Sequence, residues 1–169
     1  MALRFRGESV HKVDSKGRVS IPASFRRVLE AGDPDWTEGL NPNLVIVYGG
    51  AGQKYLEVYT QEAIADVDDR ISRMPRGSKE RRYMEHMFNG QSVPTSADDT
   101  GRLVLSPKLR DKVGIRAEAY FKAAGDTFQI WAPEAYEDKN ADMEEWAAAQ
   151  GEDFDPLTLL EMAVPASGE

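Results

Sequence analysis

The sequence contains no cysteine and only two histidines, His11 and His86. The absence of cysteine excludes disulfide bonds and thiolate metal sites, and it agrees with a reducing compartment. The two histidines lack the HxxxH and HExxH spacings of zinc sites, so we expect no metal or other cofactor. No run of about 18 apolar residues is present, and no apolar segment follows the first arginines. We therefore expect a cytoplasmic protein without a membrane span.

Motifs for catalysis are also missing. The glycine-rich stretch Gly49–Lys54 resembles a phosphate-binding loop, but Gln53 separates Gly52 from Lys54 and a strand pattern follows. A phosphate loop needs Gly-Lys, then Ser or Thr, then a helix, so the stretch is better explained as a hairpin turn. No Ser/His/Asp combination stands out. The sequence predicts neither an enzyme nor a small-molecule substrate.

Positive charge is scarce overall, since the net charge is -8, but it is unevenly distributed. Residues 1–30 have a local net charge of +4, residues 31–131 of -2, and residues 132–169 of -10. Such an asymmetry favours a basic face at one end of the molecule and an acidic segment elsewhere. Judged by charge alone, a solvated surface without function explains the pattern equally well.

The stretch Val13–Pro22, with sequence VDSKGRVSIP, predicts a strand end, a tight turn and a second short strand. Asp14 begins the turn because its short side chain can accept from nearby backbone N–H groups, and Gly17 supplies a positive φ. Val19 and Ile21 then alternate with polar residues, as in a strand with one apolar face. A helix opened by a proline follows to about residue 31. The turn thus carries two cations on a rigid frame.

The chain repeats this pattern 84 residues later, in Asp98–Arg110. Two further blocks recur in the same order: residues 56–63 match 128–135, and residues 7–10 match 90–93. Three matching blocks indicate an internal duplication, and each copy is near the size at which a lone hydrophobic core is marginal. We therefore expect the two copies to pack on each other, on other subunits, or both.

The periodicity predicts a β-β-α-β-β order in the first copy and a mainly β fold with short helices (α+β) overall. We expect Phe5–Val13 to form the first strand, with Val10 and Phe5 facing inward, and the arginines of the helix after Pro22 to point outward. The predicted domains are as follows: module 1 at 4–64, a helical linker at 65–88, module 2 at 89–135, and a C-terminal helix with an acidic tail at 136–169. The tail is expected to be partly disordered or docked on a neighbour.

The turn cations Lys16 and Arg18 are candidates for contact with nucleic acid. An arginine on a rigid turn can meet phosphate oxygens or donate two hydrogen bonds to guanine O6 and N7. Three nearby cations would widen this surface, namely Arg4, Arg6 and Lys12. The alternative is that Arg18 only pairs with Asp14 and stabilises the turn; both roles can coexist.

Together, the Arg4–Glu8 block, the Asp14–Pro22 block and the Asp98–Arg102 block resemble the MraZ family, bacterial transcriptional regulators with two tandem SpoVT/AbrB-like modules. The resemblance implies swapped-hairpin modules that form a pseudo-twofold double-split β-barrel, and a ring-shaped homo-oligomer. It also implies binding to repeated boxes of double-stranded DNA at the nucleoid, with repression of the division and cell-wall gene cluster, including the protein's own gene. The family's DNA-contacting arginine falls on Arg18.

The second copy departs from the first, because Lys16 becomes Thr100, Arg27 becomes Asp111, and Lys12 has no basic counterpart. We therefore expect copy one to dominate DNA binding, with Arg102 as a lesser contact and with Asp14 and Asp98 orienting the arginines. Two alternatives remain: an AbrB-type antitoxin, which the duplication and the short tail disfavour, and a ring-forming interaction scaffold without a role on DNA. A scaffold would tolerate removal of the charges of Lys16 and Arg18.

Overall fold

A computed structural model describes residues 3–166 of the chain. In it, strands of the two repeat copies are interleaved in one sheet. The elements, in chain order, are β1 (Glu8–Lys12), β2 (Arg18–Ser20), α1 (Ala23–Ala31), β3 (Asn43–Val47), β4 (Tyr55–Thr60), α2 (Gln61–Ser72), α3 (Lys79–Glu85), the π-helical turn η1 (His86–Gly90), β5 (Ser92–Ser96), β6 (Arg102–Val104), α4 (Pro107–Val113), β7 (Glu118–Ala123), β8 (Thr127–Trp131), α5 (Pro133–Ala148) and the 3-10 helix η2 (Pro156–Met162). The chain divides into one unit up to Tyr136 and another from Glu137 onward.

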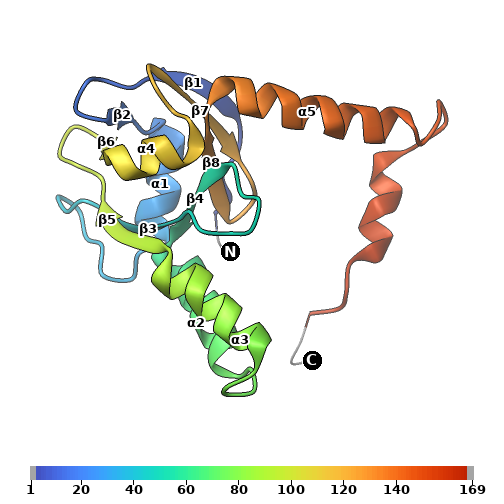
Figure 1. Ribbon diagram of the computed structural model, residues 1–169, viewed down its shortest axis with the longest axis horizontal. Helices are drawn as coiled ribbons and strands as arrows, with labels where there is room; N and C mark the ends of the chain where they lie inside the picture. The colour runs from blue at the N-terminus through green and yellow to red at the C-terminus, as the bar shows by residue number, and fades with distance from the viewer. Residues whose placement is uncertain (1–2, 167–169) are drawn as a thin grey trace. The chain divides into compact units, whose positions relative to one another are not determined.

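The first unit is built on a six-stranded antiparallel sheet with the order β1-β7-β8-β4-β3-β5 (Figure 1). A separate two-stranded antiparallel ribbon pairs β2 with β6. Strands β1 to β4 belong to the first copy and β5 to β8 to the second, so both the sheet and the ribbon are shared. If each strand is replaced by its counterpart in the other copy, β1 by β5, β3 by β7 and β4 by β8, the same order results, read from the opposite edge of the sheet. The mixed α+β class with a mainly antiparallel sheet is thereby confirmed.

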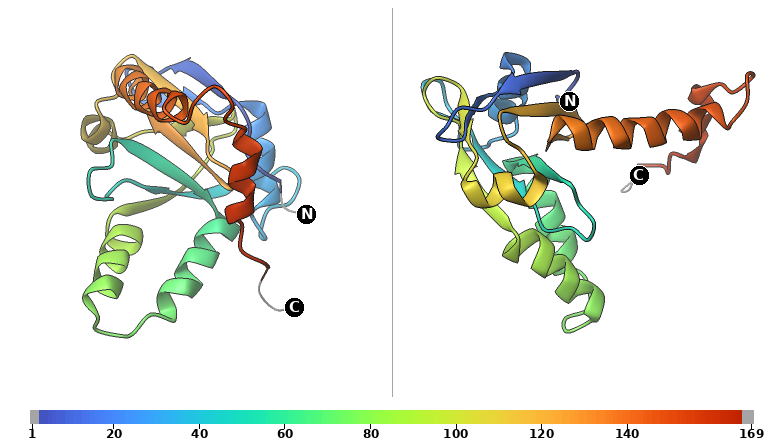
Figure 2. Two further views of the ribbon diagram at one scale, coloured as in Figure 1. Left: turned by 90° about the vertical axis from the view of Figure 1, so that its right-hand side faces the viewer. Right: turned by 45° about the horizontal axis from the view of Figure 1, so that its top comes forward.

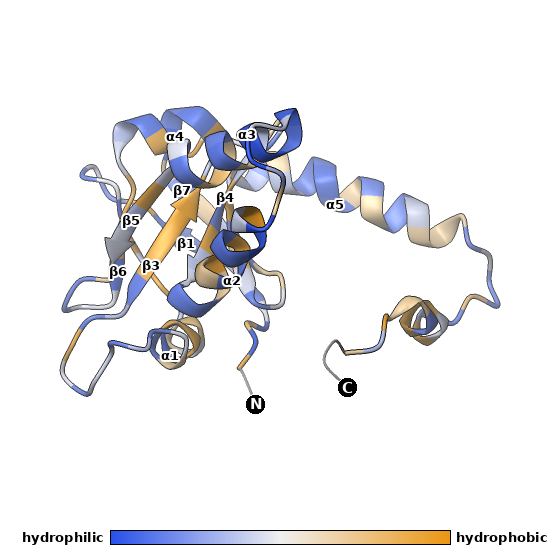
Figure 3. Ribbon diagram, turned by 90° about the horizontal axis from the view of Figure 1, so that it is seen from below, coloured by the Kyte–Doolittle hydropathy of each residue, from blue (hydrophilic) through white to orange (hydrophobic). Residues whose placement is uncertain are grey.

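One hydrophobic core lies between the sheet, the ribbon and the two short helices that follow the ribbon strands. The helix α1 contributes Phe25, Val28 and Leu29, and α4 contributes Leu109 and Val113, all of them buried. Both sets recur at helical spacing and face the core. In Figure 3 the strand β3 is hydrophobic along most of its length. Because both copies supply this core, neither copy has a complete core alone.

A second hydrophobic cluster lies on the other face of the sheet, beneath the hairpin of α2 and α3. Its buried residues are Val47, Tyr59, Ile64, Ile71 and Phe88. Thr60 caps α2 by accepting from the N–H of Ala63, and the two helices run side by side away from the sheet (Figure 2). The two helices are separated by the loop around Pro75, and α3 ends at Glu85 and continues as a π-helical turn.

Two local expectations were wrong. Val10 is 47% exposed, because β1 begins at Glu8 and its inward positions are Ser9 and His11. A one-residue change in register reverses the face that a strand residue occupies. Phe5 is buried as expected, although it lies before the strand, at an isolated bridge to Gly125. Arg26 does not point into solvent, since it bonds to Glu30 and to the carbonyl of Asp98 in the second copy. Helical periodicity does not reveal this contact, because it joins residues 72 positions apart.

The unit from Glu137 onward contains most of α5 and the short η2. Met143 and Trp146 are 61% and 52% exposed, and Trp146 makes an edge contact with Phe154, with 6.2 Å between the ring centroids. The Asp155 side chain caps η2 by accepting from the N–H of Leu157. Within residues 3–166, no helix has the length and apolar character needed to cross a membrane.

Candidate nucleic-acid interface

The first turn is held by the carboxylate of Asp14. Its Oδ1 accepts from the backbone N–H groups of Lys16 at 3.0 Å and of Arg18 at 2.9 Å, and its Oδ2 lies 2.6 Å from Arg18 Nε. Gly17 has a φ of +82°, as predicted, and donates to the carbonyl of Asp14. These donors, above all the N–H of Arg18, lower the pKa of Asp14. The carboxylate therefore both folds the turn and orients the guanidinium.

The second turn repeats this frame around Asp98. The Oδ1 of Asp98 accepts from the N–H groups of Thr100 at 2.9 Å and of Arg102 at 2.8 Å. Arg102 Nε is 3.3 Å from Asp98 Oδ2 and also donates to the hydroxyl of Thr100 at 2.8 Å. The pKa of Asp98 is lowered, again mainly by the backbone N–H of the arginine. Each turn thus presents an arginine held by an aspartate, and each arginine is about one-third exposed.

The β2–β6 ribbon brings the two arginines onto one surface. Arg18 pairs with Val104 and Ser20 pairs with Arg102, while the central pair, Val19 and Leu103, is buried. Since side chains alternate along a strand, Arg18 and Arg102 lie on the outward face. This face borders a shallow hollow that is also lined by Lys12, Asp14 and Glu118, among others. Three of the predicted cations are therefore gathered here: Lys12, Arg18 and Arg102.

Lys16 lies at the exposed tip of the first turn, and within residues 3–166 its side chain forms no ion pair. Its ammonium is therefore available to an external anion. Lys12 is exposed at the end of β1 opposite Glu118, the residue with which it is in register on β7.

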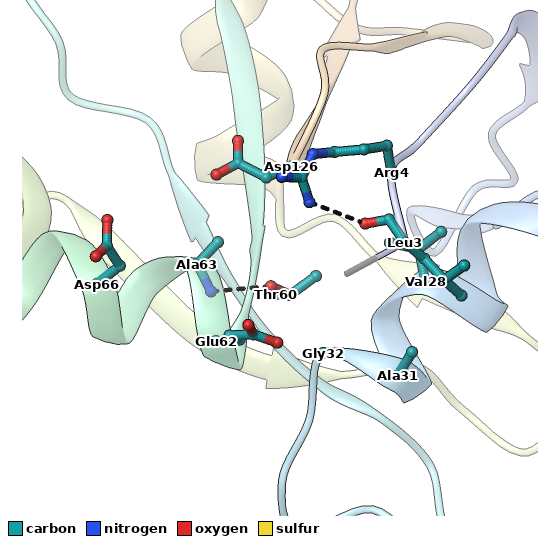
Figure 4. A pocket seen from close by; sticks show the side chains of 10 residues that line it. All are labelled: Leu3, Arg4, Val28, Ala31, Gly32, Thr60, Glu62, Ala63, Asp66 and Asp126. Atoms are coloured by element: carbon teal, nitrogen blue, oxygen red, sulfur yellow. Dashed lines mark hydrogen bonds between the residues drawn. The ribbon is translucent and has the colours of Figure 1, made fainter. Parts of the chain in front are cut away.

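Arg4 and Arg6 do not lie on the surface of the β2–β6 ribbon. The chain around them runs beside the β7–β8 turn, where Phe5 bonds to Gly125. Arg4 lines a pocket with Thr60, Asp126 and others at the start of α2 (Figure 4). About eight extended residues, some 26 Å, separate Arg6 from Asp14. The structure therefore separates these two arginines from the ribbon, although the sequence grouped all of them together.

Two residues of the first copy that hold the second turn were not predicted from the sequence. Arg26 of α1 donates to the carbonyl of Asp98 at 3.3 Å, and Asn41 donates to the side chain of Asp99 at 2.8 Å. Arg110 of α4, the counterpart of Arg26, donates within its own copy to the carbonyl of Leu105, which lies beside Gly17. One signal was present, since arginine occupies the same position of both repeats at Arg26 and Arg110. No group of three or more metal-ligating side chains occurs within residues 3–166.

Comparison with known proteins agrees with the repeat. The family model described as "MraZ protein, putative antitoxin-like" matches residues 4–86 and again residues 87–155. A protein of Ruegeria pomeroyi named "Transcriptional regulator MraZ" is 63% identical over 164 residues, which are 96% of this chain and 98% of the relative. Proteins of the same name are 60% identical in Ruegeria sp. strain TM1040, with the same coverage, and 42% identical over 168 residues in Cereibacter sphaeroides, covering 95% of this chain and 98% of the relative.

The duplicated turn, the shared sheet and this similarity over nearly the whole length lead to one conclusion: the chain belongs to the MraZ family.

Proposed function

We propose that the protein is a sequence-specific transcriptional regulator that binds double-stranded DNA through the β2–β6 ribbon and the first turn. The observation that carries the proposal is the outward row of Arg18 and Arg102, each held by an aspartate at the end of its own turn. Orientation before binding reduces the entropy lost when a long side chain meets its target. The names of the relatives support the same role.

The geometry suits the major groove of B-DNA. That groove is about 12 Å wide and admits a two-stranded β-ribbon. An arginine at its floor can donate two hydrogen bonds to guanine O6 and N7, and lysines at its edge can meet phosphates. In this arrangement Arg18 reads a base, whereas Lys16 and Lys12 contact the backbone. Arg102 is a weaker contact, because its guanidinium is shared between Asp98 and Thr100.

The proposal extends to assembly and target. The shared sheet and ribbon close into a pseudo-twofold double-split barrel, and several copies form a ring that follows repeated DNA boxes. The target is the division and cell-wall gene cluster with the protein's own gene, which it represses at the nucleoid. Light scattering on the full chain measures the mass of the assembly, and a promoter–reporter fusion in cells with and without the protein measures the direction of regulation.

Fluorescence anisotropy tests the DNA contact. Wild type and Arg18→Ala are titrated with a duplex from upstream of the protein's own gene and with a scrambled duplex of equal length, at about physiological salt. We expect tight binding of wild type to the native duplex only, and its loss in the variant. Lys54→Ala, which removes an exposed cation from the turn between β3 and β4, serves as the control and retains binding.

Weak binding that is equal on both duplexes and unaffected by Arg18→Ala would overturn the proposal and favour the scaffold. Specific binding that survives Arg18→Ala would retain a regulator but remove the first turn as its reader. Both outcomes are separable from misfolding, because Arg18 is on the surface and the melting temperature of each variant is measured in parallel.

A further inference from the structure

The densest positive charge in the molecule lies outside the turns, in residues 70–82 at the end of the α2–α3 hairpin. This tip segment, with sequence RISRMPRGSKERR, contains six arginines and lysines and one acidic residue. The preceding stretch, 62–69, contains four acidic residues and no basic one. The hairpin is therefore strongly polarised, with an acidic stem and a basic tip. A separation of charge on this scale creates a local field that the net charge of the protein conceals.

The tip segment is held in one conformation. The side chain of Arg81 is only 12% exposed, and its Nη1 donates to the carbonyl of Met74 at 2.9 Å and, less closely, to that of Ser72. Ser78 caps α3 by accepting from the N–H of Arg81, and Gly77 takes a φ of +86° in the loop. Arg81 thus satisfies carbonyls at the end of α2 and fixes the loop that connects the helices.

The remaining cations of the tip segment face solvent. Arg76, Lys79 and Arg82 are exposed, and within residues 3–166 none of the three forms an ion pair. Arg70 and Arg73 are also about 70% exposed, but each has an acidic partner one turn earlier on α2. Three cations, one in the loop and two on α3, therefore lack a counter-charge from the described part of the chain.

The chemistry of the tip segment favours a phosphate backbone over a protein partner. Stable protein interfaces have an apolar centre. Between residues 61 and 90, Tyr83 is the only large apolar side chain that is markedly exposed, and its hydroxyl is engaged with the N–H of Ala51. Protein–DNA interfaces, in contrast, are polar and strongly positive. The tip also lies apart from the β2–β6 ribbon (Figures 1 and 2), so it cannot share the groove that the first turn would occupy.

We propose that the tip segment is a second, sequence-independent DNA-binding site, in which Arg76, Lys79 and Arg82 contact phosphates of duplex DNA outside the stretch held by the first turn. This inference rests on the proposed function, because it takes duplex DNA as the ligand. It adds a site that extends the bound length of DNA and contributes affinity but no discrimination. Arg81 is a positioning residue, because it holds the loop and does not meet the phosphates.

The experiment compares the full-length wild type with a triple variant, Arg76→Gln, Lys79→Gln and Arg82→Gln, on duplexes of about 12 and about 40 base pairs that share the same upstream box. Each phosphate contact contributes about 0.9 to the slope of log affinity against log salt, so three contacts contribute about 2.7. Between 50 and 200 mM salt, the affinity of wild type for the long duplex should fall about 40-fold more than that of the variant. On the short duplex the two proteins should behave alike.

A control variant, Lys54→Gln, Lys112→Gln and Lys139→Gln, removes the same charge from other exposed positions and should leave both slopes unchanged. Equal loss in the control and the tip variant would overturn the inference, since the effect would come from net charge. An unchanged slope in the tip variant would overturn it too, as would a changed assembly mass with unchanged DNA binding, which would make the tip a protein interface. If wild type binds no duplex, the proposed function fails as well. If Arg18→Ala abolishes discrimination while the tip variant keeps the salt slope of wild type on the long duplex, the proposed function stands and the second site falls.

Discussion

The turn Asp14–Arg18 and the turn Asp98–Arg102 share one hydrogen-bonded frame but carry different charges. In both, an aspartate accepts from two backbone N–H groups and holds an arginine. The first turn, DSKGR, has a net charge of +1, and the second, DDTGR, a net charge of -1. Duplication has therefore preserved the geometry while the surface chemistry diverged. The frame therefore serves folding in both copies, whereas the charge that the proposed DNA contact needs is present only in the first turn.

The two turns are also enclosed differently. The loop after α1 is long, residues 32–42, and its Asn41 bonds to the second turn. The loop after α4 is short, residues 114–117, and makes a backbone contact with the end of β1 through Val13. Both turns make the same backbone bond to the opposite copy: the N–H of Leu105 donates to the carbonyl of Gly17 at 2.8 Å, and the N–H of Ile21 donates to the carbonyl of Gly101 at 2.9 Å. The second turn is also held by side chains of the first copy, whereas at the first turn the carbonyl oxygen of Leu105 lies directly over Gly17.

Substitution of the turn glycines should give the largest difference between the turns. A Cβ at Gly17 would overlap the carbonyl oxygen of Leu105, and the positive φ disfavours any side chain. We expect Gly17→Ala to lower the free energy of unfolding by about 3 kcal/mol. At Gly101 the Cβ would meet only Arg26 Nη1, at 3.5 Å, so Gly101→Ala should cost about 1 kcal/mol from the backbone alone. Urea denaturation of both variants measures the two values.

Equal losses at the two glycines would contradict the idea that a Cβ meets backbone at Gly17 but only a side chain at Gly101. Gly39→Ala serves as a matched control. Gly39 has a φ of +92° and nothing within 4 Å of its Cβ position, so it reports the cost of the dihedral angle without a clash.

The next largest difference is expected between the effects of Arg18→Ala and Arg102→Ala on DNA affinity. We expect Arg18→Ala to weaken binding to the native duplex by about 2 kcal/mol, roughly 30-fold, because a base contact is lost. Arg102→Ala should weaken it less than about fivefold, because its turn carries net negative charge and lacks the lysine. Anisotropy titrations at a single salt concentration measure both. Equal loss in the two variants would refute the dominance of the first copy.

The acid dependence of stability should be alike in both turns. The pKa of Asp14 and that of Asp98 are lowered in the folded state, so each ionised carboxylate stabilises the fold above its unfolded pKa of about 3.9. This contribution is lost as the pH falls through the folded pKa, because the folded state must then bind the proton. Asp14→Asn and Asp98→Asn should each differ from wild type at pH 6 and converge on it below about pH 4. Thermal melts between pH 2.5 and 7 test this, and a response of only one variant would mean that the frames are not equivalent.

The turns were predictable because their determinants are local. Asp, Gly and Arg within five residues specify the frame, and the repeat doubled the signal. The separation of Arg4 and Arg6 from the ribbon was not predictable, since it depends on where β1 begins and on its pairing with β7. The contacts of Arg26 and Asn41 with the second turn were not predictable either. They join residues that are 72 positions apart for Arg26 and 58 positions apart for Asn41. The sequence shows which side chains are candidates for contact with DNA, whereas the strand register decides which of these candidates lie together on one surface.

Conversion of the second turn toward the first should give the smallest effect. Thr100→Lys restores the lysine of the first turn and brings the net charge of residues 98–102 from -1 to zero. It also removes a hydroxyl that donates to Asp98 Oδ1 and accepts from Arg102 Nε, so Arg102 becomes held by its aspartate alone, as Arg18 is. We expect affinity for the native duplex to rise by no more than about threefold and the salt slope to steepen by about 0.9, the value for one phosphate contact. Thr100→Val, which removes the hydroxyl without adding charge, separates the two causes. A rise in Thr100→Val as large as in Thr100→Lys would show that release of Arg102, and not the added cation, limits the contribution of the second turn.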